Sequence, residues 1–317
     1  MPYTIPISGV SIGHAIDEKV ATGTTAVIFD HPTLAAAHIL GGAPGTRDTE
    51  LLNPEFTVSD VDAICLSGGS AYGLDAAGGV QAWLREQGRG IELAPVRIPI
   101  VPSAILFDLR NEGDKDWGQF SPYRDLGYEA AANAAVTSEQ GKVGAAFGAL
   151  TATTPGGIGF ASSTLKNGAT VMAMAAVNAA GAPTIGSTNH FWAAPFEEAN
   201  EFGGRGLPNP WPEDAKIPRT KAGQRVAGTN TTLGVVITDA MLDAAQAKRL
   251  AMSSHDGFAR ALYPVHTPAD GDLVFTASTR RIDIDDEGLM DLGIIAGNVM
   301  ARAIATGVYH AMEAKHA

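Results

Sequence analysis

The chain has 317 residues, and 45% of them are hydrophobic, which is the composition of a globular protein rather than of a disordered one. Its formal net charge is −12, and a surface of that sign repels nucleic acid and anionic membranes, so we expect neither as a partner. A chain of this length can bury a substantial core as a single domain.

The N-terminal residues, MPYTIPISGVSIGHA, lack a basic segment followed by a long apolar one, so no secretory signal is expected. No apolar run approaches the roughly twenty residues that cross a membrane. We therefore expect the protein to be cytoplasmic.

In the first third of the chain, short apolar strands alternate with glycine-rich turns. Residues 25–30 and 61–67 are predicted strands, and the second contains the single cysteine, Cys65. One cysteine excludes an internal disulfide and a cysteine-based zinc site, and in this apolar run we expect a buried thiol. A helix is predicted over residues 74–87, with Gly88 as its C-terminal cap. Its apolar positions on one face are Leu74, Ala77, Val80 and Leu84.

The middle of the chain predicts a buried hairpin. Residues 98–108 are apolar and extended, and residues 109–130 read as a polar loop that ends in a short helix. Residues 160–178 are expected to form two strands joined by a two-residue type I′ turn, Asn167-Gly168. The second strand, ATVMAMAAV, is apolar on both faces, so we expect it inside the sheet, where it ends at Asn178.

A long connector separates this hairpin from the last third of the chain. Residues 193–228 carry several prolines, a Gly-Gly pair and mixed charge, and compact domains usually avoid such a segment unless it has a function. Order resumes at Asn230, with a predicted strand over residues 233–238 and another over residues 273–277. A helix is predicted over residues 244–262, and the last helix has an apolar face. The first of these helices is predicted from its capping box, Asp243 and Gln246. The last helix is predicted from an apolar face that consists of Leu292, Ile295, Val299 and Ala303.

The junction of connector and strand, GTNTTLG over residues 228–234, can support self-cleavage. The hydroxyl of Thr231 can attack the carbonyl of Asn230, and hydrolysis of the resulting ester leaves Thr231 with a free α-amino group. That amine has a pKa near ~8, so part of it is neutral and can serve as base for the hydroxyl of the same residue. The same letters are also typical of an ordinary strand entry, because threonine favours strands, and they match an N-glycosylation sequon.

Segments over nearly the whole chain resemble the family of L-aminopeptidase/D-esterases, β-aminopeptidases and 6-aminohexanoate-oligomer (nylon) hydrolases. These segments are VSIGHA, GGAPGTRDTELL, CLSGGSAYGLDAAGGV, VPSAILFDL, GGIGFAS, AAVNAAG, TNTTLGVVITDA and HDGFARALYPVHTPADGD. A threonine after an asparagine at the cleavage point is most similar to the nylon hydrolases, since other members use serine.

The resemblance implies a single N-terminal-nucleophile-like domain over residues 1–317, built as an αββα four-layer sandwich. It implies self-cleavage between Asn230 and Thr231 into an α chain, residues 1–230, and a β chain, residues 231–317. It also implies a homo-oligomer of αβ units, with a tetramer as the expected form.

Three further site residues follow from the resemblance. Asn178 matches the active-site asparagine, whose side-chain amide can donate to the oxyanion of a tetrahedral intermediate, although a turn asparagine at a strand end has the same pattern. Asp270 and Asp272 match a polar pair near the new N-terminus, where a carboxylate can hold the α-amino group and keep it protonated. The sequence alone also allows a solvated Asp-Gly turn at this point.

The GGSAYG segment lies between a predicted strand and a predicted helix. Backbone N–H groups of Gly69 and Ser70 can hold an oxyanion there, so both are pocket candidates. Tyr72 occupies the last glycine position of a G-x-S-x-G elbow, so Ser70 is not expected to be a nucleophile of that type.

The sequence departs from the family pattern at two places. Phe107, a third pocket candidate, stands where several members have a tyrosine, so a phenol donor is missing. The nylon hydrolases have an active-site lysine near the position of Thr153, where this chain has none, and Lys142 or Lys166 would have to replace it.

Other hydrolase and metal sites fit the sequence less well. A Ser70, His255 and Asp256 triad is conceivable, but adjacent residues in a predicted helix point in different directions. The acidic run over residues 283–288 resembles a calcium loop, but its twelfth position is Ile294 instead of glutamate, so a solvated turn is expected. We expect no metal and no organic cofactor.

The sequence therefore predicts a self-processing threonine amidohydrolase or aminopeptidase that acts on small peptides, amides or ω-amino-acid oligomers through an acyl-enzyme. Two alternatives remain open. One is an acyltransferase of the ornithine-acetyltransferase type, although the Ala-Thr-Met-Leu cleavage sequence of that family is absent. The other is a relative that never cleaves or has no activity and acts as a binding protein.

Overall fold

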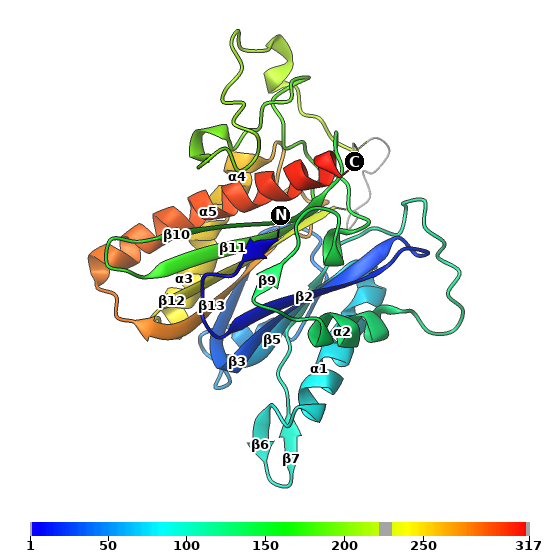
Figure 1. Ribbon diagram of the computed structural model, residues 1–317, viewed down its shortest axis with the longest axis vertical. Helices are drawn as coiled ribbons and strands as arrows, with labels where there is room; N and C mark the ends of the chain where they lie inside the picture. The colour runs from blue at the N-terminus through cyan, green and yellow to red at the C-terminus, as the bar shows by residue number, and fades with distance from the viewer. Residues whose placement is uncertain (1, 222–229, 315–317) are drawn as a thin grey trace.

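The longest strand, β3 (Thr22–Ile39), belongs to both halves of the β structure (Figure 1). Its first half pairs antiparallel with β2 (Val10–Asp17) and β5 (Asp60–Ser67), and its second half pairs with β13 (Leu273–Ile282). The pairing with β5 shifts register after Ile28, where the strand passes from one half to the other. The computed structural model describes residues 2–221 and 230–314.

Two sheet halves diverge from β3 and face one another. The first runs in the order β10 (Gly157–Thr164), β11 (Thr170–Asn178), β12 (Thr231–Ala240), β13 and the second half of β3. The other contains β2, the first half of β3, β5, β8 (Ser103–Ile105) and β4 (Thr46–Arg47). Neighbours in the first half are antiparallel except β12 and β13, which run parallel.

Helices cover the outer face of each half (Figure 1). Helices α3 (Ala244–Ser254), α4 (Asp256–Ala261) and α5 (Asp286–Glu313) pack on the first half. Helices α1 (Ala76–Glu86) and α2 (Tyr123–Ala132) pack on the second. This arrangement agrees with the predicted αββα sandwich.

Side-chain alternation along the strands divides the buried residues among three cores, one between each pair of layers. In β11, Met172 and Met174 face the core between the sheets, whereas Val171 and Ala173 face α5. In β12, Leu233, Val235 and Ile237 face the core between the sheets. The first residue of β12 and the last residue of β11 therefore point into the same space.

Helix α5 has 28 residues and is the one helix among those described that is long and apolar enough to cross a membrane. It instead lies along β10 and β11, and its buried residues belong to the core on that side (Figure 1). A core helix meets the same criteria of length and composition, so α5 is no argument for a membrane span. Asp285, from the acidic run of the sequence, caps it by accepting a hydrogen bond from Gly288 N at 2.8 Å.

The hairpin of β10 and β11 is confirmed, but the predicted two-residue turn is wrong. The last pair of the ladder is Thr164 with Thr170, so five residues, 165–169, connect the strands. Gly168 has a φ of +89° and donates to Leu165 O, while Asn167 is not among the residues with positive φ. A type I′ turn needs positive φ at both central residues, which this loop does not supply.

The single helix predicted over residues 244–262 is broken. It ends at Ser254, and α4 begins at Asp256, so His255 forms the junction. Short elements that the sequence pattern did not predict complete the fold. These are the two-stranded pairs β1 (Tyr3–Thr4) with β9 (Thr137–Ser138) and β6 (Ile91–Leu93) with β7 (Val96–Ile98), and the 3-10 helices Glu50–Leu52, Ser70–Asp75, Gly144–Ala146, Ala194–Phe196 and Glu213–Lys216.

The connector is irregular, as predicted, over the part that the structure describes. Between residues 193 and 221 it contains two 3-10 turns and otherwise no helix or strand. The remaining part of the predicted connector, residues 222–228, lies outside the described residues, as does Thr229. Asn230 and Thr231 are described, and they begin the pairing of β12.

The capping box of α3 is confirmed and gives a test of the fold. Asp243 accepts from Gln246 N at 2.8 Å, and Gln246 accepts from Asp243 N at 2.9 Å. Replacing Asp243 with alanine leaves an N–H group of the first turn without its acceptor, so we expect the free energy of unfolding to fall by about 1 kcal/mol. Urea unfolding measures this change. Asp283→Ala, at an exposed position ahead of α5, is the matched control, and equal midpoints for the two variants would contradict the capping role.

Candidate active site

The active-site threonine and asparagine predicted from the sequence lie side by side. Thr231 begins β12, Asn178 ends β11, and the antiparallel register pairs them directly. Directly opposed residues have Cβ atoms roughly 5 Å apart and project from the same face of a sheet. Both side chains are buried, with 2% of each residue exposed. The register therefore brings together two residues that are distant from one another in the chain.

The peptide bond before Thr231 has close polar contacts on its carbonyl oxygen. Thr231 Oγ1 donates to Asn230 O at 2.5 Å, and Gly271 N donates to the same oxygen at 2.8 Å. Asn230 also forms a parallel bridge with Asp270, which fixes this peptide against the turn of residues 270–272. The hydroxyl is thus placed at the carbonyl that it would attack.

A side chain at Gly271 would collide with both Thr231 and the backbone of Ala43. A Cβ atom there would lie 2.6 Å from Thr231 Oγ1 and 2.8 Å from Ala43 O. The loop of residues 41–43 packs closely against this turn, since Gly41 N donates to Asp272 O and Ala43 N donates to Asp270 O. The GGAPG segment of the sequence therefore supports the turn that carries the two aspartates.

Asp270 is held by the backbone and by one hydroxyl. Its Oδ2 accepts from Thr267 N at 2.8 Å and Thr267 Oγ1 at 2.6 Å, and its Oδ1 accepts from Ala180 N at 3.2 Å. Burial, and after it the charge of Asp272, raises the pKa of Asp270. The carboxylate is therefore a fixed, buried part of the site and not a solvated turn residue.

Asp272 contacts the chain immediately after Thr231. Its Oδ1 accepts from Thr232 N at 2.7 Å, and its Oδ2 is 2.9 Å from His266 Nδ1 and accepts from His266 N at 3.2 Å. The predicted pair of aspartates thus lies beside the predicted new N-terminus. His266 was not among the residues predicted from the sequence.

The amide of Asn178 has a defined orientation. Its Oδ1 accepts from Leu150 N at 3.1 Å, and because a backbone N–H can only donate, the oxygen has to face Leu150. Its Nδ2 donates to Phe107 O at 3.0 Å. The pocket candidate Phe107 therefore contributes its backbone carbonyl to the site, and Asn178 retains a second side-chain N–H.

A buried lysine completes the site, and it comes from the connector. Lys221 Nζ donates to Asn178 Oδ1 at 2.9 Å and to Asn178 O at 3.1 Å. Burial lowers the pKa of Lys221 to about 7, although the charges of Asp270 and Asp272 oppose this shift. The site thus contains an amine that is close to its titration point near neutral pH.

Lys221 forms part of the walls of two cavities. The larger, of about 410 Å³, also contains Asn230 in its wall, and the smaller, of about 20 Å³, contains Asn178. The larger volume lies within the usual size range for a small-molecule site. The other residues of its wall are Ala180, Pro218, Thr220, Thr267, Pro268 and Ala269.

Gly69 and Ser70 were predicted as oxyanion donors, but their N–H groups are already engaged. Gly69 N donates to Asp108 Oδ1 at 2.8 Å, and Ser70 N donates to Leu106 O at 2.9 Å. Asp108 also accepts from Thr22 Oγ1 at 2.6 Å, and burial raises the pKa of Asp108. This network ties the segment to the end of β8, so the two groups are structural in this geometry.

The lysines considered as replacements lie elsewhere. Lys166 is exposed in the loop between β10 and β11, at the end of β11 away from Asn178. Lys142 Nζ lies 5.6 Å from the ring centroid of Phe147. The lysine that contacts Asn178 is instead Lys221.

The residues of the conceivable serine triad are not brought together. His255 Nε2 donates to His38 O in the helix layer of the first sheet half, and Asp256 pairs with Arg260 at 3.6 Å. Ser70 lies at the other sheet half, beside β8. Within residues 2–221 and 230–314, no group of three His, Cys, Asp or Glu side chains is placed to hold a metal ion.

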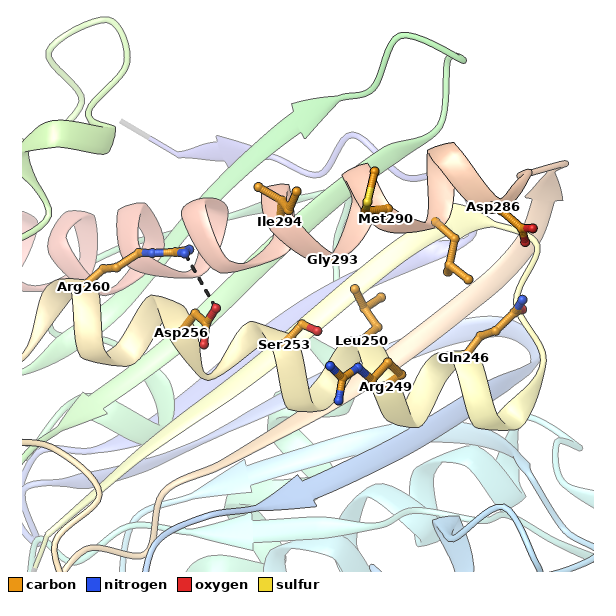
Figure 2. Close-up of a pocket in the computed structure, with 11 residues that line it drawn as sticks. Gln246, Arg249, Leu250, Ser253, Asp256, Arg260, Asp286, Met290, Gly293 and Ile294 are labelled. Carbon is orange, nitrogen blue, oxygen red and sulfur yellow. Dashed lines mark ion pairs between the residues drawn. The ribbon is translucent and has the colours of Figure 1, made fainter.

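A groove of about 390 Å³ lies between α3, α4 and α5, on the outside of the sandwich (Figure 2). Its walls combine apolar residues such as Met290 and Ile294 with the ion pair of Arg260 and Asp256. Neither Thr231 nor Asn178 belongs to it, so its size alone does not make it the reaction site.

The sequence identified part of this site. Thr231, Asn178, Asp270 and Asp272 were predicted, and the structure gathers them around one peptide bond. Lys221 and His266 were missed. His266 could have been found from its place in the same VHTPADGD segment as the two aspartates, whereas no local pattern marks Lys221 within the connector.

Comparison with known proteins identifies the family of the chain and supports its fold. The profile of peptidase family S58 matches residues 5–317. The chain is 38% identical to an "Uncharacterized aminopeptidase" of Mycobacterium tuberculosis, over 96% of this chain and 93% of that protein. It is 28% identical to a 6-aminohexanoate-oligomer endohydrolase of an Agromyces species, over 93% of this chain and 83% of that protein.

Solved structures share the fold at low identity. A β-aminopeptidase of a Burkholderia species superposes with a TM-score of 0.67 and 18% identity, over 97% of this chain and 88% of that chain. The L-aminopeptidase D-Ala-esterase/amidase of Ochrobactrum anthropi, which is described as a variant of the Ntn-hydrolase fold, superposes with a TM-score of 0.69 and 19% identity, over 97% and 87%. Since the family profile covers almost the whole chain, the protein belongs to peptidase family S58 and is a hydrolase of amide or peptide bonds.

Proposed function

We propose that this protein is a self-processing amidohydrolase that cleaves its own chain between Asn230 and Thr231 and then uses Thr231 as its nucleophile. The observation that carries the proposal is the 2.5 Å contact from Thr231 Oγ1 to the carbonyl oxygen of Asn230. The products of cleavage would be an α chain of residues 1–230 and a β chain of residues 231–317.

Self-cleavage would proceed through an ester. Thr231 Oγ attacks the carbonyl carbon of Asn230, and the negative charge that develops on Asn230 O is stabilised by the N–H of Gly271, which is 2.8 Å away. The C–N bond then breaks, and the nitrogen of Thr231 takes up the proton that the attacking hydroxyl gave up and becomes an amine. Water hydrolyses the remaining ester, which frees the hydroxyl of Thr231 and the carboxylate of Asn230.

Turnover would use the same hydroxyl with the new amine as its base. Thr231 Oγ attacks the substrate amide, its proton passes through the α-amino group to the leaving amine, and water releases the acyl group from the ester. We assign the second N–H of Asn178 to the substrate oxyanion, because the first donates to Phe107 O. The Oδ1 of the adjacent Asp272, which already accepts from Thr232 N, would hold the α-amino group.

The substrate class follows from the cavity and from the relatives. A space of about 410 Å³ fits a small amide or a short peptide. Relatives include proteins named as aminopeptidases and as 6-aminohexanoate-oligomer endohydrolases, so short peptides and ω-amino-acid oligomers are the first substrates to test. A homo-oligomer of αβ units in the cytoplasm remains part of the proposal.

The main test is the intact mass of purified, denatured protein. Wild type and Thr231→Ser are expected to give two fragments that divide the chain after Asn230, because both keep the hydroxyl. Thr231→Val, which has the same shape without the hydroxyl, is expected to stay intact at 32.7 kDa and to hydrolyse no amide. A cleaved and active Thr231→Val protein would exclude this mechanism. A wild type that stays intact on long incubation would favour the non-cleaving relative, and transfer of the acyl group to an added amine would favour the acyltransferase.

Gly271→Ala tests the arrangement at the cleaved bond. The new Cβ would lie 2.6 Å from Thr231 Oγ1, so the hydroxyl or the N–H that stabilises the oxyanion has to move. Loss of one oxyanion donor typically slows a reaction by about 10²–10³-fold, and we expect self-cleavage to slow by that order. Gly78→Ala in α1 is the matched control, since the three atoms nearest to its Cβ would all belong to the side chain of Arg124, at 3.4 Å or more. Equal cleavage half-times of both variants and wild type would contradict the role of Gly271.

Lys221→Met tests the buried amine through the pH dependence of stability. The pKa of Lys221 in the folded chain is about 7, below the ordinary 10.5, so the unfolded chain binds more protons between these values. The free energy of unfolding of the chain that carries Lys221 therefore rises from about pH 7 to pH 10.5. The stability advantage of Lys221→Met over that chain shrinks over the same range.

We expect Lys221→Met to be the more stable chain by a few kcal/mol at about pH 6, and to lose this advantage by about pH 10. Urea unfolding in the Thr231→Val background, which keeps one chain, measures the difference. Lys166→Met, at an exposed loop position, is the matched control. A stability difference between the Lys221→Met chain and its lysine parent that stays constant over this pH range would show that burial does not displace this pKa.

A further inference from the structure

His266 is attached to Asp272 by two hydrogen bonds to one oxygen. Its Nδ1 lies 2.9 Å from Asp272 Oδ2, and its backbone N donates to the same oxygen at 3.2 Å. The other oxygen of Asp272 accepts from Thr232 N at 2.7 Å. A continuous path of hydrogen bonds therefore joins His266 to the residue that follows the nucleophile.

The direction of the ring contact follows from the carboxylate. An ionised carboxylate can only accept, so Nδ1 of His266 has to carry the proton in this contact. Asp272 has 1% of its surface exposed, which makes its contacts with protein donors the main determinants of its position. His266 supplies two of the three donors to this side chain that the structure gives.

The backbone of His266 is strained in a way that serves this contact. Its φ is +53°, a left-handed conformation that is unfavourable for a residue with a Cβ atom. The conformation directs both the N–H and the ring of the same residue at Asp272 Oδ2. Such strain persists only where the surroundings determine it, and here the surroundings are a buried carboxylate beside the nucleophile.

The ring of His266 is also held by side chains of α4 and of the junction between α3 and α4. Phe258 of α4 stacks on it with ring centroids 5.3 Å apart, and His255, at the junction of α3 and α4, packs edge-on at 5.0 Å. His255 in turn donates to His38 O of β3 at 3.1 Å. The ring of His266 is thus held by contacts other than the one with Asp272, and it is in a position to orient the carboxylate instead of following it.

The neighbouring residue performs the equivalent task for the other aspartate. Thr267 donates to Asp270 through its N–H and its hydroxyl, while His266 donates to Asp272 through its N–H and its ring. Two consecutive residues therefore each hold one aspartate of the Asp-Gly-Asp turn.

We propose that His266 is a positioning residue, which acts through Asp272 to hold the N–H of Thr232, and with it the nucleophile Thr231, in the geometry for self-cleavage and turnover. This inference rests on the proposed function for its effect on rate, and on the structure alone for its effect on the Thr232 amide. It assigns to His266 a role that its sequence segment does not specify.

Two variants separate the donor from the ring. His266→Phe keeps a ring between Phe258 and His255 but removes the donor to Asp272. His266→Asn keeps a side-chain N–H at a position close to that of Nδ1, and asparagine tolerates positive φ. His38→Gln is the matched control, because the ring of His38 packs on His255 and not on Asp272.

The first readout is the half-time of self-cleavage, together with kcat and KM of the mature enzyme. We expect His266→Phe to slow cleavage and lower kcat by about tenfold or more, the usual effect of losing a hydrogen bond to a charged group, with little change in KM. His266→Asn is expected to restore most of the rate, and His38→Gln to match wild type. Wild-type rates in His266→Phe, or an Asn variant as slow as the Phe variant, would overturn the proposal.

The second readout is independent of cleavage. In the Thr231→Val background, hydrogen exchange of the peptide that contains Thr232 is expected to be faster for His266→Phe and unchanged for His266→Asn. If wild type does not cleave, the proposed function fails while this measurement still decides the role of His266. If His266→Phe does not fold, the histidine NMR signals of the Thr231→Val chain decide, and a His266 ring protonated only at Nε2 would overturn the proposal.

Discussion

The register of β11 against β12 is the constraint on which the rest of the site depends. It pairs Asn178 with Thr231, and both side chains point into the space between the sheets. A slip of one residue would turn every side chain of β12 to the other face, so the same register positions Thr231 and the apolar residues that follow it in β12. The burial that stabilises the sandwich is therefore also what specifies the geometry of the site.

A second constraint is the cost of burying charge at the end of these strands. Asp270, Asp272 and Lys221 are all buried, and an unpaired buried charge is strongly destabilising. The two aspartates accept hydrogen bonds from Thr267, Ala180, His266 and Thr232. The lysine donates to two oxygen atoms of Asn178. Each of these groups is consequently held in one position, which is what a site that aligns a hydroxyl with a carbonyl requires.

The sequence alone predicted those candidate site residues that stand at the ends of regular strands. Thr231 and Asn178 stand at strand ends, and the strands were recognisable from their apolar residues, so both could be predicted together with the layered α/β fold. Lys221 could not, because it lies in an irregular connector whose path depends on tertiary contacts such as that of its N–H with Ala180 O. Local sequence reasoning also could not exclude Gly69 and Ser70 as oxyanion donors, since only the fold shows that Asp108 and Leu106 already engage those N–H groups.

In the proposed mechanism, self-cleavage and turnover make different demands on the same residues. Before cleavage the nitrogen of Thr231 belongs to an amide, so it cannot act as the base for the hydroxyl, whereas after cleavage it is an amine. The carbonyl that has to be activated is also different, and in the intact chain it is Asn230 O, which Gly271 contacts. In this proposal the N–H of Gly271 serves the first reaction and the amide of Asn178 serves the second, whereas Asp272 serves both, because it holds the N–H of Thr232 and would also hold the new amine. A single strand end could serve both reactions because the turn on one side and β11 on the other supply different groups to it.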